Sequence, residues 1–458
     1  MVAALLLPAQ AGIGSTRRAS SRLLPDKPNI LLILTDDQRW DEINHMATVQ
    51  ADLVGRGVHF LNGMVSDPLC CPSRATILTG TYSHTNGIYT DLAKNGGGFP
   101  HFHDQTTIAT VLKARGYATA LVGKYLNDYN PKNASYIPPG WQTWFAATDE
   151  GYRRFAISDQ GTNKNFTGTG AYLTDVEGQK AVAVINATPQ NQPLFLYFAP
   201  FAPHTPSVPT PKYKGSLLDL PPLRPPSYNE QDVSDKPKYI RKVGPWDATK
   251  IAKIDALRIH MYQTLLSVDD WIKTILATLS STGRLNNTLI VYMSDNGYLL
   301  GEHRVDGKTV PYEESIKVPF VVRWDAAHWN VPREDDHLVA NVDLAETFAE
   351  AAGRTMPGSE GDSLLPLLAD PSTPWRTELL LEHSGPYASR PPYCGVRGAR
   401  WVYVQYATGE EELYDLQTDP YQLHNVAAVP ADASILAQMR ADDHVLCSPV
   451  PPGFGWSH

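Results

Sequence analysis

Four continuous apolar runs constrain most strongly what this chain can fold into. Asn29–Leu34, Ala118–Val122, Leu194–Phe198 and Leu289–Met293 lack the apolar-polar alternation of a half-buried strand, so each predicts a strand buried on both faces. Between them lie helical patterns, the clearest at Ile254–Leu279, where apolar residues recur every three to four positions. This alternation of strands and helices predicts an α/β fold with a large, mostly parallel sheet flanked by helices.

Polar side chains follow all four runs. They are Asp36 and Asp37, Lys124, His204, and Asp295 with Asn296. Since the carboxyl ends of parallel strands meet at one edge of a sheet, and ligands of open α/β sheets bind there, we expect these side chains to form one site. The carboxylate and amide oxygens among them suit Ca²⁺ or Mg²⁺ and do not match a structural zinc site.

The composition and the hydrophobic pattern change along the chain and predict three parts. Residues 1–27 form an N-terminal tail whose apolar run, Val2–Ala11, resembles the core of a secretory signal without the preceding basic residue, so both a remnant signal peptide and a merely apolar tail fit. Residues 28–370 form the predicted catalytic domain, in which the proline-rich segment 203–250 is expected to be a long ordered loop.

Residues 371–458 form the predicted C-terminal subdomain. Short apolar segments separated by Gly and Asp turns, at Leu379–Leu381, Trp401–Gln405 and Glu412–Tyr414, predict a small antiparallel sheet there.

Charge and cysteine usage exclude several classes of protein. The 39 Lys and Arg against 48 Asp and Glu give a net charge of −9, so no basic excess favours nucleic acid as a partner. No window is apolar enough for a membrane span. Cys70 and Cys71 are neighbours and cannot easily bridge each other. Cys394 and Cys447 remain, and both a disulfide and two buried free thiols fit the sequence.

The sharpest local pattern is Cys70-Cys71-Pro72-Ser73-Arg74, followed by Leu78-Thr79-Gly80. It resembles the signature of the type I sulfatases, Cys-x-Pro-Ser-Arg followed by Leu-Thr-Gly. The resemblance implies an alkaline-phosphatase-like fold and a maturation enzyme that oxidises Cys70 to formylglycine (3-oxoalanine), whose hydrate is the family's nucleophile. Cys71 occupies the free position of the signature.

The resemblance also implies roles for the residues at the strand ends. One divalent cation, usually calcium, with magnesium as an alternative, would be held by Asp36, Asp37, Asp295 and Asn296 together with the group at Cys70. Arg74 and Lys124 would bind the sulfate. His204 and Lys308 would bind it too and protonate the leaving alcohol, as expected for a histidine near neutral pH.

One departure from the family pattern concerns the base that eliminates the sulfate. Many sulfatases read Gly-Lys-Trp-His where this chain has Gly123-Lys124-Tyr125-Leu126-Asn127, and Leu126 cannot accept a proton. His303 is one candidate for that base, and a substrate contact or a packed surface histidine are the alternatives.

The resemblance favours the glucosamine-6-sulfatase branch and its bacterial arylsulfatase relatives. It predicts a secreted, periplasmic or lysosomal sulfuric ester hydrolase acting on an aryl sulfate or a sulfated sugar such as 6-O-sulfated glucosamine in a glycosaminoglycan. Two other functions remain open: a phosphonate monoester or phosphodiester hydrolase of the same superfamily, and a non-catalytic protein that binds sulfated glycans.

Overall fold

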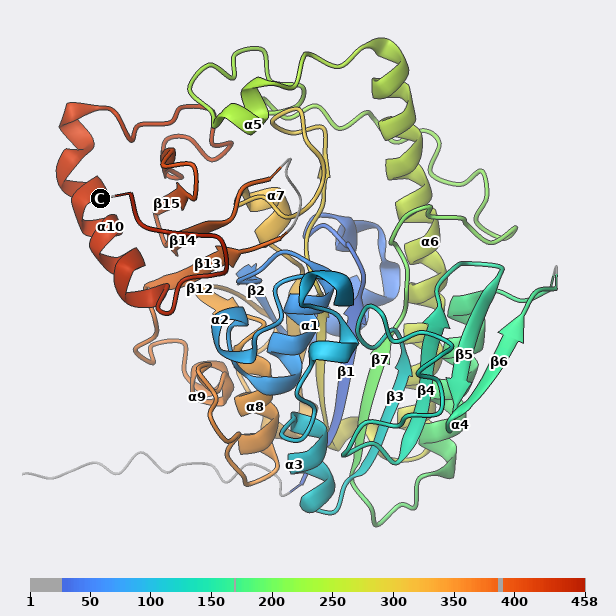
Figure 1. Cartoon of the computed structure of the whole chain (residues 1–458). Helices are drawn as coiled ribbons and strands as arrows, with labels where there is room; N and C mark the ends of the chain where they lie inside the picture. The colour runs from blue at the N-terminus through green and yellow to red at the C-terminus, as the bar shows by residue number, and fades with distance from the viewer. Residues whose placement is uncertain (1–26, 169, 386–389, 458) are drawn as a thin grey trace, which may run out of the picture.

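A ten-stranded sheet forms the centre of the molecule (Figure 1). The computed structural model describes residues 27–168, 170–385 and 390–457, so the predicted signal-like run lies outside the described residues. The strands of this sheet are β1 (Asn29–Thr35), β2 (Val58–Met64), β3 (Ala118–Gly123), β4 (Thr143–Asp149), β5 (Phe155–Asp159), β6 (Thr162–Phe166), β7 (Leu194–Ala199), β8 (Thr288–Ser294), β11 (Phe320–Arg323) and β12 (Arg333–Ala340). Their order is β12-β2-β11-β8-β1-β7-β3-β4-β5-β6.

The four apolar runs are the central strands β1, β3, β7 and β8, as predicted. β1 pairs in parallel with β7 and β8, and β3 pairs in parallel with β7 and β4. Antiparallel strands follow on both sides, with β11 beside β8 and the β4-β5-β6 meander at the other edge. The carboxyl ends of the parallel strands therefore share one edge, where the site was expected.

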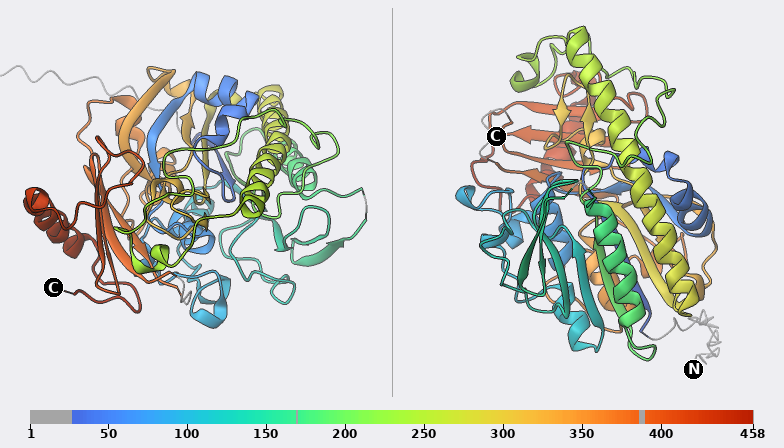
Figure 2. Two further views of the ribbon diagram at one scale, coloured as in Figure 1. Left: turned by 90° about the horizontal axis from the view of Figure 1, so that it is seen from above. Right: turned by 90° about the vertical axis from the view of Figure 1, so that its right-hand side faces the viewer.

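Helices cover both faces of the sheet. Alternate residues of β1 point to opposite cores: Ile30 and Leu32 to the face of α1 (Cys70–Thr79), α3 (Ile108–Ala114) and α8 (Asp343–Ala351), and Leu31 and Ile33 to the face of α4 (Leu173–Ala187) and α6 (Ala248–Ser281). Figure 2 shows α4 and α6 side by side on their face of the sheet. Such two-sided burial explains why β1 lacks polar alternation.

Two segments outside this layer matter for the site. The predicted loop 203–250 contains one short helix, α5 (Lys238–Arg241), before α6 begins after Asp247, whose side chain accepts from the Lys250 amide at 2.8 Å. A small hairpin, β9 (Leu299–Leu300) with β10 (Asp306–Gly307), follows the end of β8. The remaining helices are α2 (Ser83–Asn86), α7 (Glu313–Ile316), α9 (Leu365–Ala369) and α10 (Ala433–Leu446).

A second, four-stranded antiparallel sheet lies in the C-terminal part, as predicted. Its strands, in order, are β13 (Glu378–His383), β14 (Tyr393–Gly398), β15 (Trp401–Tyr406) and β16 (Glu411–Asp415). Sequence analysis missed β14. Leu436 and Met439 of α10 pack on one face of this sheet (Figure 1), while its other face packs against Met64 of β2 and Leu338 of β12.

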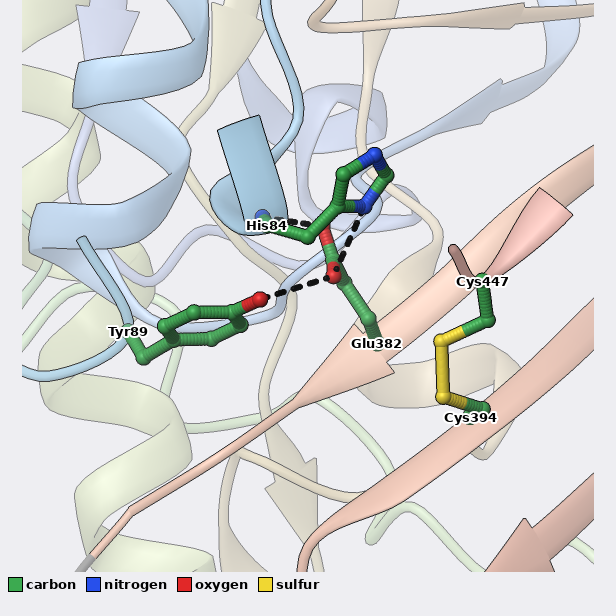
Figure 3. The surroundings of a disulfide bond; sticks show 5 residues. All are labelled: His84, Tyr89, Glu382, Cys394 and Cys447. Carbon is green, nitrogen blue, oxygen red and sulfur yellow. Dashed lines mark hydrogen bonds and ion pairs between the residues drawn. A yellow bond between two sulfur atoms is a disulfide. The ribbon is translucent and has the colours of Figure 1, made fainter. Parts of the chain in front are cut away.

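A disulfide between Cys394 and Cys447 joins β14 to the end of α10. The two Cα atoms are 6.1 Å apart and both side chains are fully buried, so the structure has the bridge rather than the two free thiols. Figure 3 shows it near Glu382 of β13, whose carboxylate accepts hydrogen bonds from His84 and Tyr89.

Removing this disulfide should destabilise the chain without removing the active site. The bridge closes a loop with a sequence separation of 53 residues, so the double change Cys394→Ala and Cys447→Ala should lower the free energy of unfolding by about 2–4 kcal/mol. Urea unfolding followed by circular dichroism measures this. A reductant should lower the midpoint of the wild type and leave that of the double variant unchanged; equal stability of the two proteins would contradict the prediction.

Candidate active site

The polar side chains that follow β1, β3 and β7 meet around Cys70. Cys70 Sγ lies 3.3 Å from Asp36 Oδ1 and 3.9 Å from Asp37 Oδ1. Lys124 Nζ donates to Asp36 Oδ2 at 2.7 Å, and His204 Nε2 lies 3.6 Å from Asp37 Oδ2. The structure therefore brings together groups that are far apart in the sequence at the expected edge of the sheet.

Helix α1 carries Cys70 at its first position and Arg74 one turn later. Leu69 precedes it in an extended conformation, and Gly80 ends it in the left-handed region at φ 69°, with its amide donating to Thr76 O at 2.8 Å. All ten residues of the helix are buried, so packing on every side fixes its rotation. Cys70 and Arg74 consequently face the same edge of the sheet.

Arg74 connects the carboxylates behind Cys70. Its Nε donates to Asp295 Oδ2 at 2.8 Å and its Nη1 to Lys124 O at 2.9 Å. Nη2 lies 3.7 Å from Asp36 Oδ2 and makes no hydrogen bond in the described part of the chain. A fully buried guanidinium with an unused donor is suited to bind one further oxygen atom at this place.

The charges in this cluster depend on one another. Burial opposes ionisation of Asp36, but Lys124, His204 and Arg74 outweigh it and lower the pKa of this carboxyl. Burial, followed by the charge of Asp36, raises the pKa of Asp295 despite the contact with Arg74. Carboxylates that repel each other in a buried space favour binding of a cation, which would relieve the repulsion.

Lys308 contacts Cys70 directly. Its Nζ contacts Asp37 Oδ1 and lies 2.7 Å from Cys70 Sγ and 3.4 Å from Asn296 Oδ1. Burial opposes the charge of Lys308, but Asp37 and Cys70 outweigh it and raise the pKa of this ammonium. The amide of Asn296 also donates to Asp37 Oδ1, at 2.7 Å. Lys308 is therefore a fixed, charged donor within reach of the group at position 70.

His204 is the most accessible of these groups, with a side chain 28% exposed. Its Nδ1 lies 2.7 Å from Thr205 O. Because a carbonyl only accepts, Nδ1 must carry the proton, and Nε2 faces Asp37. Tyr152 donates to His204 O at 2.7 Å, and the ring of Phe201 packs against the imidazole with centroids 4.7 Å apart. A held imidazole at the open side of the site can exchange a proton with a bound molecule.

The oxygen donors fit a divalent cation. Ligand atoms of Asp36, Asp37, Cys70 and His204 all lie within 4.8 Å of one another. Asp295 Oδ1 accepts from the Asp37 amide at 3.1 Å, which places a third carboxylate beside them. Several carboxylates and an amide in one buried space match the hard oxygen ligands that Ca²⁺ and Mg²⁺ prefer. This donor set therefore could hold one such ion.

As an unmodified thiol, Cys70 is poorly suited to attack. Burial, and then the charge of Asp36, raise its pKa well above the ordinary value even though two lysines oppose this. The thiolate is the nucleophilic form of cysteine, so such a thiol is largely inactive near neutral pH. Cys71 is also buried, and it packs in the core that contains α3 and α8.

The structure does not place His303 beside Cys70. His303 is fully buried, with Nδ1 2.8 Å from Glu230 Oε2, and its ring stacks on Tyr312 at 4.0 Å between centroids. Burial lowers its pKa to about 3. His303 is thus a packed histidine, but it lies in the interior and not at the surface as that alternative expected. Leu126 stands at the position where many sulfatases have the histidine that acts as base. Its side chain is buried in the apolar core and cannot take that role.

Sequence reasoning missed Glu150 at the end of β4. Its Oε2 lies 3.6 Å from Lys124 Nζ. β4 pairs in parallel with β3 and runs three residues beyond the partner of Gly123, so its carboxyl end reaches the same edge of the sheet. β4 was not predicted from the sequence, so Glu150 could not be placed at this edge.

A family model described as sulfatase matches residues 28–354. The chain belongs to the sulfatase family. A second model, described as the C-terminal part of N-sulphoglucosamine sulphohydrolase, matches residues 301–445. The fold and the family predicted from the Cys70 motif are thus confirmed.

Relatives of this sulfatase include enzymes with named sugar substrates. The chain is 31% identical over 467 residues to human N-acetylglucosamine-6-sulfatase, covering 90% of this chain and 83% of the relative. It is 33% identical to a putative extracellular sulfatase Sulf-1 homolog of Caenorhabditis elegans, covering 79% of this chain. The chain spans only 53% of that relative and 34% of the Drosophila melanogaster homolog.

Solved structures share the fold of this sulfatase. One, described as a complex with its substrate D-glucosamine-2-N,6-O-disulfate, has a TM-score of 0.81 at 24% identity and covers 92% of this chain and 98% of its own. A phosphonate monoester hydrolase of Agrobacterium radiobacter has a TM-score of 0.74 at 20% identity, covering 92% and 95%. None of the helices in the described ranges combines the length and apolarity needed to cross a membrane.

Proposed function

We propose that this chain is a sulfuric ester hydrolase that releases sulfate from a sulfated sugar or an aryl sulfate. The observation that carries the proposal is the arrangement around Cys70, where three cationic side chains, Arg74, Lys124 and Lys308, converge from different elements. Compact ammonium groups and a guanidinium with a free donor can bind the oxygens of one tetrahedral anion. The net charge of −9 does not oppose this, because the cations are local.

Each residue has a task that follows from its place. Lys124, beside Asp36, and Lys308, beside Cys70, bind sulfate oxygens, and Arg74 Nη2 supplies a further hydrogen bond. His204, at the accessible side, gives a proton from Nε2 to the leaving alcohol once it is protonated there.

Two groups that this chain would acquire complete the chemistry. Conversion of Cys70 to formylglycine by a maturation enzyme supplies the nucleophile that the buried thiol lacks. Asp36, Asp37, Asp295 and Asn296 would hold a divalent cation, Ca²⁺ or alternatively Mg²⁺, which would supply Lewis-acid polarisation of the sulfate.

The relatives support a sulfated glycan as substrate. Human N-acetylglucosamine-6-sulfatase and the substrate-bound structure both act on sulfated glucosamine according to their names, so 6-O-sulfated glucosamine in a glycosaminoglycan is the substrate class we assign. A secreted or lysosomal place fits the relatives named extracellular sulfatases and the Cys394–Cys447 disulfide.

Paired ester substrates test this assignment against the phosphonate monoester or phosphodiester hydrolases that share the fold. The matured enzyme should hydrolyse 4-nitrophenyl sulfate with a kcat/KM at least about tenfold above that for 4-nitrophenyl phenylphosphonate or bis(4-nitrophenyl) phosphate, a difference of about 1.4 kcal/mol in transition-state binding. Preference for either phosphorus ester would refute the sulfatase assignment. Binding of sulfated glycan without hydrolysis of any ester would instead indicate a non-catalytic protein.

A further inference from the structure

Lys308 lies in a turn whose backbone has strained φ angles. It follows β10, and its neighbours Gly307 and Thr309 have positive φ angles of 114° and 72°. Glycine adopts such angles freely, whereas a β-branched residue in the left-handed region costs about 1–3 kcal/mol. Contacts from outside the turn must therefore hold Thr309, and with it the direction of the Lys308 side chain.

Arg390 makes these contacts on both sides of Lys308. Its Nη2 donates to Asp306 O at 3.3 Å, and its Nη1 donates to Thr309 Oγ1. A side chain at Gly307 would begin 3.5 Å from Arg390 Nη2, so the guanidinium lies directly against the turn. The Thr309 amide in addition donates to Pro68 O at 3.2 Å, two residues before Cys70. The turn is thus tied to the chain that leads into α1.

Arg390 comes from the C-terminal part, between β13 and β14, and has no carboxylate partner in the described part of the chain. Burial lowers its pKa, but a guanidinium remains charged in proteins. Burial of a guanidinium without an ion pair costs free energy, so its charge does not explain its place in the fold. Its hydrogen-bond donors instead contact the turn formed by residues 306–309, which carries Lys308 of the active site.

We infer that Arg390 is a positioning residue: it clamps the Asp306–Thr309 turn and so holds Lys308 Nζ between Cys70 and Asp37. The inference rests on the proposed function, because it assigns Arg390 to the same reaction. It also makes the C-terminal part a component of the active site, since the direction of Lys308 depends on a side chain 81 positions beyond its neighbour Thr309.

Steady-state kinetics of Arg390→Ala and Arg390→Lys with 4-nitrophenyl sulfate test this inference. Small displacements of a group that binds the reacting atoms cost about 10²-fold in rate, so we expect kcat to fall by about 10- to 100-fold in Arg390→Ala. Arg390→Lys should recover part of the loss through one retained hydrogen bond. Arg400→Ala is the matched control, because Arg400 lies in the turn between β14 and β15 of the C-terminal sheet and forms an ion pair with Asp415 at 2.6 Å.

Chemical rescue separates positioning from a general structural defect. Millimolar guanidinium should raise the kcat of Arg390→Ala severalfold and leave the wild type and Arg400→Ala unchanged. A loss that guanidinium does not restore, together with a lowered melting midpoint, would overturn the inference. So would a change confined to KM, which would mean that Arg390 contacts the substrate itself.

Measuring the affinity for sulfate tests the role of Arg390 independently of the proposed function. Calorimetry with inorganic sulfate, in a Cys70→Ala background, should show an affinity several-fold weaker when Arg390→Ala is added, because Lys308 is displaced. Equal affinity would overturn the role of Arg390 whether or not the wild type hydrolyses sulfate esters. Absence of hydrolysis in the matured wild type, in contrast, would overturn the proposed function alone.

Discussion

Replacing Cys70 with alanine should abolish hydrolysis of 4-nitrophenyl sulfate and leave the fold intact. The three cations that we expect to bind sulfate all lie around this side chain, and no other nucleophile of the described residues stands among them. Loss of a nucleophile costs many orders of magnitude, so kcat should fall by at least about 10⁴-fold. Circular dichroism and the melting midpoint should stay close to those of the wild type, because a buried cysteine and an alanine differ little in volume.

Cys71 offers a matched control for this prediction. It is adjacent to Cys70 and equally buried, but it packs in the apolar core away from the carboxylates. Cys71→Ala should therefore retain most of the activity. Retained activity in Cys70→Ala, or equal losses in both variants, would refute the role of Cys70.

Mass spectrometry tests the modification directly. Trypsin should release residues 57–74, which contain both cysteines, because Arg56 and Arg74 flank them. In active enzyme this peptide should carry one alkylated thiol, at Cys71, and be lighter than the same peptide with both thiols alkylated. A fully active preparation with both thiols alkylated would contradict conversion of Cys70 to formylglycine.

The central strands were predictable because burial on both faces leaves a direct mark on the sequence. Between their first and last residues β1 and β8 are continuous apolar runs, and polar residues begin where each run ends. The outer strands carry no such mark. β6 reads Thr-Asn-Lys-Asn-Phe, and the first half of β12 is acidic, so both resemble loops until their neighbours pair with them. Strand propensity at the edge of a sheet is decided by tertiary pairing.

Site residues that follow an apolar run could be predicted, whereas residues placed by tertiary contacts were missed. Asp36, Lys124 and Asp295 follow strands that could be located, so their convergence could be foreseen. Arg390 reaches Thr309 across 81 positions from a loop without a local pattern. His303 shows the reverse case, because it was a candidate for the site and the structure places it elsewhere. It is close to Lys308 in sequence, but its own φ of 53° and that of Arg304, 59°, turn the backbone so that its ring faces Glu230.

Removing divalent cations should inactivate the enzyme and lower its melting temperature. The carboxylates of Asp36, Asp37 and Asp295 share a buried space, and within the described ranges Asp37 accepts a hydrogen bond from a single cationic side chain, that of Lys308. Without a metal ion their repulsion is relieved only in part. An ion that binds the folded state alone stabilises it by about 2.7 kcal/mol at a concentration of 100 times its Kd. Dialysis against EDTA should therefore reduce kcat by at least about 100-fold, and added Ca²⁺ should restore it.

A variant of one active-site carboxylate tests whether the effect of Ca²⁺ arises at this site. Asp37→Asn keeps the shape of the side chain and removes its charge, so the rise of the melting midpoint on addition of Ca²⁺ should be lost. Asp270→Asn is the control, since Asp270 lies on the exposed side of α6 and pairs with Lys212. It should show the same Ca²⁺-dependent rise as the wild type. A rise that persists in Asp37→Asn would place the ion elsewhere, and an EDTA-treated enzyme with full activity would show that this site works without a divalent cation.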